Sequence, residues 1–116
     1  IHDIVDYYII VDKSVNDSTL LNFVKQCDSY DDDLVSTYID FLRNVKFPRN
    51  KQTVLTCRRS MQAGKPVYTD LTLCRFSKKL IDSGLKYIHT HKAHPNIFWP
   101  SVIILNNLRM TTISIA

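Results

Sequence analysis

The chain has 116 residues, the size of a single domain, and its 45% hydrophobic and 22% charged residues exclude a disordered chain. No apolar stretch approaches the roughly eighteen residues of a membrane span, so the sequence predicts no membrane partner. The net charge of +4 is unevenly distributed, because nine of the eleven aspartates lie before residue 43.

The start of the chain does not resemble a signal peptide. It begins with Ile1, and Asp3 and Asp6 stand where a signal peptide carries positive charge before an apolar run. We therefore expect a single domain over residues 1–116 that is excised from a longer chain or polyprotein, with a viral protein as one possible source.

The three cysteines are an odd number and have no CxxC spacing. This argues against a disulfide framework and predicts a reducing compartment inside the cell, the cytoplasm or the nucleus. The one disulfide considered joins Cys57 to Cys74, because both fall in predicted neighbouring strands.

The first third of the chain predicts one strand and two helices. Residues Ile4–Val11 are rich in Ile, Val and Tyr, as in a largely buried strand. A helix is expected up to Cys27, because Asn16, Asp17 and Ser18 offer capping oxygens and apolar residues follow at spacings of three and four. A second helix is expected from the three aspartates at 31–33 to Pro48, with the carboxylates at the positive end of its dipole. Its apolar positions are Leu34, Tyr38, Phe41, Leu42 and Val45.

The middle of the chain predicts a β-hairpin followed by a third helix. Gln52–Cys57 and Pro66–Cys74 are strand-like runs, and a loop that contains Gly64 joins them. Ser77 is the expected cap of the helix. The apolar positions expected to face the core are Leu80, Ile81, Leu85 and Ile88.

The last part of the chain predicts two short strands around a turn. Val102–Leu105 and Arg109–Ile115 flank Asn106 and Asn107, which tolerate the left-handed conformations of a tight turn. A helix over residues 102–110 is the alternative. The predicted order is β-α-α-β-β-α-β-β. It favours an α+β fold in which about three helices pack on one face of a small antiparallel or mixed sheet.

Charge separates along the sequence. Ile1–Leu42 carries nine aspartates against two lysines, a net charge of −7, whereas Arg43–Ala116 carries thirteen lysines and arginines against two aspartates, a net charge of +11. Cationic side chains contact phosphates, and exposed aromatic rings stack on unpaired bases. The candidate nucleic-acid-binding residues are Arg49, Lys51, Arg58, Arg59, Lys65, Arg75, Lys78, Lys79, Lys86 and Lys92. The candidate stacking or interface residues are Tyr68, Tyr87, Phe98 and Trp99.

These features predict a non-catalytic binding module that binds RNA, single-stranded nucleic acid or another polyanion through its predicted hairpin and third helix. The alternative is a protein-interaction module, including self-association in which the acidic first third of one copy docks on the basic part of the next. An RNA-processing enzyme is the third option. The basic surface would be lost if the aspartates folded back and neutralised it.

A run of histidines, His89, His91 and His94, is a weak candidate for a metal site. On a helix His89 and His91 point apart, so the simpler interpretation is an interaction with the end of the helix dipole. We predict no metal and no cofactor. The chain has only two glycines, which excludes a glycine-rich phosphate loop, and cysteines in buried strands are poor nucleophiles.

Overall fold

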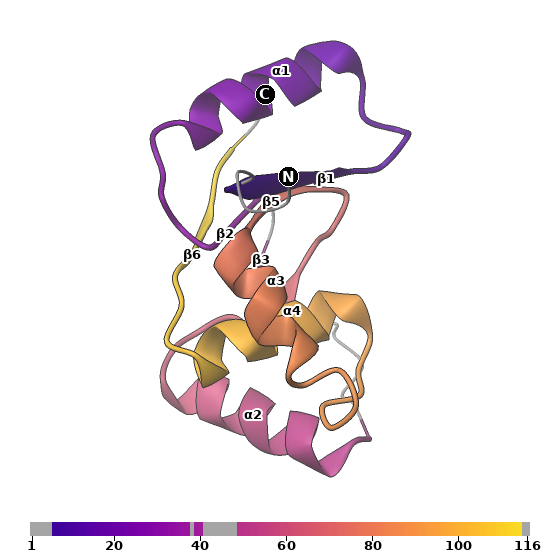
Figure 1. The fold of residues 1–116 in the computed structure, drawn as a ribbon, viewed down its shortest axis with the longest axis vertical. Helices are drawn as coiled ribbons and strands as arrows, with labels where there is room; N and C mark the ends of the chain where they lie inside the picture. The colour runs from indigo at the N-terminus through magenta and orange to yellow at the C-terminus, as the bar shows by residue number, and fades with distance from the viewer. Residues whose placement is uncertain (1–5, 38, 41–48, 115–116) are drawn as a thin grey trace.

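The structure is a computed structural model that describes residues 6–37, 39–40 and 49–114 (Figure 1). In chain order the described elements are β1 (Tyr7–Val11), α1 (Asp17–Cys27), β2 (Leu34–Ser36), β3 (Ile39–Asp40), α2 (Lys51–Gln62), β4 (Tyr68–Thr69), β5 (Leu73–Ser77), α3 (Lys78–Leu85), α4 (Pro95–Leu105) and β6 (Met110–Thr112). Four described helices and a mixed sheet confirm the predicted α+β class. Among these residues no helix combines the length and the apolar character that crossing a bilayer requires.

Strand β5 is a central strand of the four-stranded sheet, whose order is β1-β5-β2-β6. It runs antiparallel to β1 and β2, so that Phe76 pairs with Tyr8 on one side and with Leu34 on the other. β6 runs parallel to β2, and β3 and β4 form a separate two-stranded ladder. β1 is an edge strand, and its Ile9 and Val11 remain 38% and 43% exposed.

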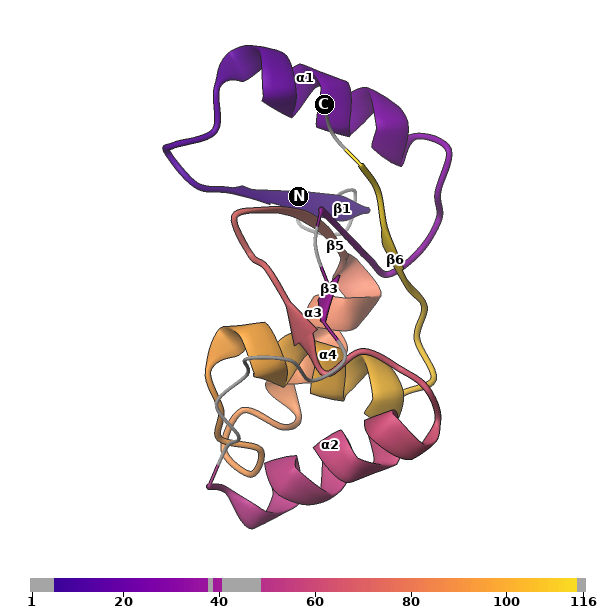
Figure 2. The same ribbon diagram turned by 180° about the vertical axis from the view of Figure 1, so that it is seen from behind.

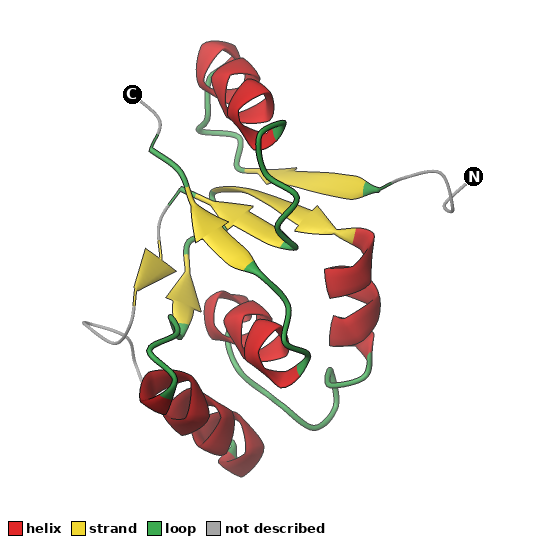
Figure 3. Ribbon diagram, turned by 90° about the vertical axis from the view of Figure 1, so that its left-hand side faces the viewer, coloured by secondary structure: helices red, strands yellow, loops and turns green. Residues whose placement is uncertain are grey.

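Helices cover both faces of the sheet, not one face as expected. α1 lies on one face, α3 and α4 lie on the other, and α2 packs on the far side of α4 (Figures 1 and 2). Figure 3 shows α4 between α2 and α3. Successive side chains of β5 point to opposite faces of the sheet. Leu73 packs with Phe23 and Cys27 of α1. Cys74 and Phe76 belong to the core between the sheet and the helices α3 and α4.

The predicted first and third helices are confirmed because their start signals are local. Asn16 caps α1, and its side chain accepts a hydrogen bond from the Thr19 amide at 2.8 Å. Ser77 caps α3, and its hydroxyl accepts one from the Leu80 amide at 3.0 Å. The expected core face of α3 is only partly right, since Leu85 is 61% exposed and Ile88, beyond the end of α3, is 51% exposed.

The second predicted helix, from the aspartates at 31–33 to Pro48, is wrong over its described part. Leu34–Ser36 is β2, and Ile39–Asp40 is β3. The other apolar positions expected on this helix lie outside the described residues: Tyr38, Phe41, Leu42 and Val45. The aspartates have another role, because Asp33 accepts hydrogen bonds from the Ser77 hydroxyl at 2.8 Å and the Arg109 amide at 3.2 Å.

The predicted hairpin is wrong in its first strand and in its pairing, whereas its second run is extended in part. Gln52–Cys57 lies in α2, whose buried face is made by small polar residues and a cysteine at helical spacing: Thr53, Thr56, Cys57 and Ser60. The second run, Pro66–Cys74, is divided between β4 and β5 by a turn at Asp70. The Asp70 carboxylate accepts hydrogen bonds from the Thr72 amide at 2.9 Å and the Thr72 hydroxyl at 2.7 Å.

The segment Val102–Leu105 is the last turn of α4, so the helical alternative is correct up to Leu105. Because α4 is buried on almost all sides, its apolar residues do not recur with a helical period, and the sequence pattern does not identify it as a helix. The expected turn follows, with Asn107 in the left-handed region at a φ of 51°. β6 lies within the predicted strand Arg109–Ile115.

All three cysteines are free and buried, so the disulfide considered between Cys57 and Cys74 does not form. Cys57 packs between α2 and α4 with Ile97, whereas Cys74 lies in the core between the sheet and the helices α3 and α4. Burial raises the pKa of each thiol, and that of Cys74 rises to about 12. Thiols of this kind are weak nucleophiles at neutral pH.

Candidate nucleic-acid interface

The outer face of α2 is basic along its length. Lys51 and Arg58 are seven residues apart and share this face, with Leu55, 48% exposed, between them. Arg59 lies next to Arg58, and Arg49 precedes the helix; all four cations are exposed. No aspartate occurs in the sequence from residue 49 to residue 69, so this face contains no acidic side chain of its own.

The segment that joins α3 to α4 brings a further cation to the start of α2. The single hydroxyl proton of Thr53 is shared between two acceptors, the backbone carbonyl of Lys92 at 3.3 Å and Asn50 Oδ1 at 3.1 Å. Figures 1 and 2 both place this segment beside the first turn of α2. We call the five exposed cations the α2 surface: Arg49, Lys51, Arg58, Arg59 and Lys92.

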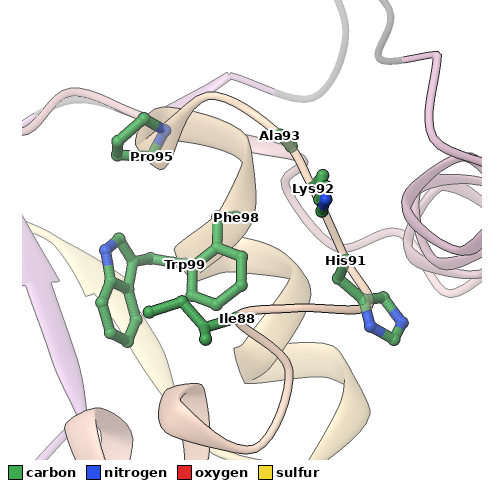
Figure 4. A pocket seen from close by; sticks show the side chains of 7 residues that line it. All are labelled: Ile88, His91, Lys92, Ala93, Pro95, Phe98 and Trp99. Carbon is green, nitrogen blue, oxygen red and sulfur yellow. The ribbon is translucent and has the colours of Figure 1, made fainter.

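A hollow of about 430 Å³ adjoins the α2 surface at Lys92 (Figure 4). Its lining is Ile88, His91, Lys92, Ala93, Pro95, Phe98 and Trp99. In Figure 4, Ile88 lies near the Phe98 ring, with Trp99 and His91 at opposite ends of the labelled group. The Trp99 indole meets the rings of Phe76 and Phe98 edge to face, at centroid distances of 4.9 and 5.0 Å. These contacts hold one wall of the hollow in place.

Three of the five remaining predicted cations form a second group on α3. Lys78, Lys79 and Lys86 line a shallow depression together with Asp82 and Ser83. Lys78 forms an ion pair with Asp82 at 2.9 Å, one helical turn away. We call the three lysines the α3 patch. Because α4 separates α2 from α3 (Figure 3), the single basic surface predicted from the sequence is divided into two.

Lys65 belongs to neither group. It follows the C-terminal end of α2 and lines a cleft with Asp32 and Arg109. A carboxylate therefore shares its surroundings, unlike those of the α2 surface.

Arg75 is not a surface residue, contrary to the sequence prediction. It is 5% exposed and projects from β5 toward α1, where its guanidinium donates hydrogen bonds to the backbone carbonyls of Cys27, Tyr30 and Asp32 at 2.9, 2.8 and 3.3 Å. The Tyr7 ring covers it, with its centroid 3.8 Å from the guanidinium carbon. Arg75 therefore secures the end of α1 and is not available to a ligand.

The four predicted aromatic residues differ in availability. Phe98 is 8% exposed and belongs to the core. Tyr68 is half-buried, and its hydroxyl accepts a hydrogen bond from Asn96 Nδ2 at 3.2 Å. Tyr87 is also half-buried and packs edge to face on His91. Of the four, only Phe98 and Trp99 line the hollow, and only Trp99 is more than marginally exposed there.

The three histidines do not converge on one point. His94 caps α4, and its Nδ1 accepts a hydrogen bond from the Asn96 amide at 3.3 Å. His91 is 9% exposed, its Nδ1 lies 2.9 Å from the Thr90 hydroxyl, and burial lowers its pKa. His89 is exposed. Within the described ranges, no group of three histidine, cysteine or acidic residues could hold a metal ion.

Among the described residues, no aspartate forms an ion pair with a cation of the α2 surface. Asp31 pairs with Arg109 at 2.6 Å beside β6, and this pairing lowers the pKa of the Asp31 carboxyl. The exposed Asp17 and Asp28 lie in the first turn and at the C-cap of α1, whereas the exposed Asp12 follows β1 and lines a hollow with Asp70 and Asn96. In Figure 1, α1 and α2 stand at opposite ends of the longest axis, which measures 40 Å. Lys78 and Arg109 are the only cations in the described part of the chain with an aspartate ion-pair partner.

The hollow could not be predicted from the sequence. The hollow has no sequence signature, because Ile88 has the spacing of a core position and His91 belongs to the run of weak metal candidates. The one available signal is the acid-free stretch from residue 49 to residue 69. Comparison of the chain with models of protein families, with curated proteins and with solved structures finds no match in any of the three.

Proposed function

We propose that this protein is a non-catalytic module that binds RNA or single-stranded nucleic acid through the α2 surface. The observation that carries the proposal is the placement of five exposed cations without an ion-pair partner among the described residues, at the end of the molecule farthest from the exposed aspartates of α1. Lysine and arginine contacts to phosphates supply most of the affinity for nucleic acid that does not depend on sequence.

A single strand fits this surface better than a duplex does. Leu55 is exposed in the middle of the cations, and the apolar hollow adjoins Lys92. Apolar and aromatic surfaces next to cations favour unpaired bases, whereas the bases of a duplex remain stacked on each other.

Head-to-tail self-association is the second candidate, and the charge polarity of the fold favours it. The exposed aspartates around α1 and the α2 surface lie at opposite ends of the 40 Å axis, so copies can associate end to end through complementary charges. Salt weakens both self-association and nucleic-acid binding, so salt dependence cannot distinguish them. The molecular mass of the protein in the absence of nucleic acid distinguishes them.

The test is a titration of a labelled single-stranded RNA of roughly ten nucleotides, followed by fluorescence anisotropy at two salt concentrations. The double variant Arg58→Ala, Arg59→Ala removes two cations from the α2 surface. The double variant Lys79→Ala, Lys86→Ala removes the same charge from the α3 patch and is the matched control. We expect a larger decrease in affinity for the α2 variant, and a salt slope that is smaller by about 0.7 for each phosphate interaction that the substitutions remove.

Equal decreases in the two double variants would show that only net charge matters and would contradict the proposed surface. Absence of RNA binding at low salt, together with a molecular mass that rises with protein concentration in light scattering, would favour self-association instead.

A further inference from the structure

The hollow beside the α2 surface is a site of its own. We infer that it takes an unpaired nucleobase of the bound strand, while the neighbouring Lys92 contacts that strand's phosphates. This inference rests on the proposed function and makes it more specific, because it assigns a place for a base as well as for the backbone.

The walls of the hollow suit a flat, apolar ring. Ile88 lines the hollow and is 51% exposed, and Ala93, Pro95, Phe98 and Trp99 supply further apolar surface. The volume of about 430 Å³ falls within the range of small-molecule pockets, roughly 300–1,000 Å³. A side chain as apolar as Ile88 left half in water is stabilised when a base covers it.

The wall formed by Trp99 is fixed before any ligand arrives. Its indole is held between Phe76, Phe98 and the backbone of Gly84. A wall that is already ordered loses little conformational entropy on binding, so more of the contact energy remains for affinity.

The polar lining of the hollow consists of His91 and Lys92. The His91 ring packs edge to face on Tyr87, and its Nδ1 lies 2.9 Å from the Thr90 hydroxyl. In Figure 4 this ring lies at the opposite end of the group from Trp99, so we assign the contact with the base to the apolar part of the lining.

Lys92 connects the hollow to the cations of α2. It lines the hollow, its side chain is exposed, and its carbonyl is tied to the first turn of α2 by the Thr53 hydroxyl. A strand that contacts Lys92 as part of the α2 surface therefore lies beside the hollow. This charge complementarity favours a nucleotide over an uncharged apolar ligand.

The test compares two strands of equal length and charge, one with normal bases and one abasic throughout. The chain has a single tryptophan, so the fluorescence of Trp99 reports on the hollow without a label. We expect the strand with bases to bind roughly tenfold more tightly and to quench Trp99, whereas the abasic strand binds through phosphates alone and leaves the emission unchanged.

Two exposed residues provide a matched pair of variants. Ile88→Ser changes an exposed residue that lines the hollow. Leu85→Ser changes a 61% exposed residue of α3 that does not line the hollow. Ile88→Ser should remove most of the difference between the two strands, and Leu85→Ser should preserve it. Lys92→Ala should weaken both strands by a similar factor.

The outcomes separate the inference from the proposed function. If both strands bind equally well and Ile88→Ser has no effect, the hollow takes no base, although the α2 surface still binds phosphates. If neither strand binds, the proposed function fails and the inference fails with it. If the protein then self-associates and Ile88→Ser returns it to a monomer, the hollow is a contact between protein molecules.

Discussion

The backbone of Gly84 lies directly against the indole of Trp99. A Cβ added at position 84 would be 2.7 Å from Cη2 of Trp99 and nearer still to Cζ3, whereas carbon atoms in contact are normally about 3.5–4.0 Å apart. α3 can pack on α4 only because residue 84 has no side chain. Glycine is retained here although alanine is more favourable inside a helix by about 1 kcal/mol.

We predict that Gly84→Ala lowers the free energy of unfolding by about 1–3 kcal/mol, because the added methyl group has to displace a packed indole. Urea denaturation followed by circular dichroism measures the change, and the emission maximum of Trp99 should shift. Leu85→Ala, at an exposed neighbouring position, is the control and should change stability by less than about 0.5 kcal/mol. A Gly84→Ala protein as stable as the wild type would mean that the indole moves aside freely.

We predict that Arg75→Met destabilises the fold by about 1–3 kcal/mol. The substitution removes the guanidinium donor from the carbonyls of Cys27 and Tyr30; the Cys27 carbonyl still accepts the Tyr30 amide, whereas the half-buried Tyr30 carbonyl loses its donor. Arg58→Met, on the exposed face of α2, is the matched control and should leave the denaturant midpoint almost unchanged. If Arg75→Met instead lowered RNA affinity while stability stayed constant, Arg75 would belong to the binding surface after all.

We predict that stability decreases in alkali because of Cys74. Burial raises its pKa in the folded protein to about 12, against 9.0 for an ordinary thiol, so the unfolded chain loses this proton first as the pH rises. The contribution is therefore fully present below about pH 9 and is lost between about pH 9 and 12, by up to about 1.4 kcal/mol per pH unit.

Unfolding curves at several pH values, measured for the wild type and for Cys74→Ala, check this prediction. Lysines and tyrosines titrate in the same range in both proteins, so only the difference between their slopes belongs to Cys74. Identical slopes would contradict the assignment. In the native protein at pH 8, a thiol reagent should modify the three buried cysteines only after unfolding.

We predict that Thr53→Val weakens both stability and RNA binding. The side chain is fully buried and its hydroxyl reaches Asn50 and the carbonyl of Lys92, so its removal should cost about 1–2 kcal/mol of unfolding free energy. Affinity should fall a few-fold because Lys92 is held less firmly beside α2. Thr53→Ser keeps the hydroxyl and should bind RNA almost as well as the wild type; equal affinity of all three proteins would show that this link does not position Lys92.

The sequence is a reliable guide to elements whose signals are local. β1, α1 and α3 are predicted from β-branched runs and from caps such as Asn16 and Ser77. α2 resembles a strand in sequence because its buried face contains the polar residues Thr53, Thr56 and Ser60, so no helical period of hydrophobic residues is visible. The predicted hairpin fails for a different reason: β5 pairs with β1 and β2, and such distant partners leave no local pattern.

The candidate site is predictable in composition but not in arrangement. The sequence identifies the cations and places the aspartates in a separate segment. It cannot show that Arg75 points toward α1, because one residue of register decides the face of a strand on which a side chain lies. Nor can it show that α4 separates Lys79 from Arg58, since that depends on how three helices pack (Figure 3).

An aspartate lies at each end of β1, the strand at one edge of the described sheet. If two copies joined their β1 strands antiparallel with Ile9 opposite Ile9, Asp6 of each copy would face Asp12 of the other. Like charges at both ends of the pairing would repel each other, although the residues between them, Tyr7–Val11, are all apolar or aromatic. This pairing of β1 with its own copy is therefore disfavoured.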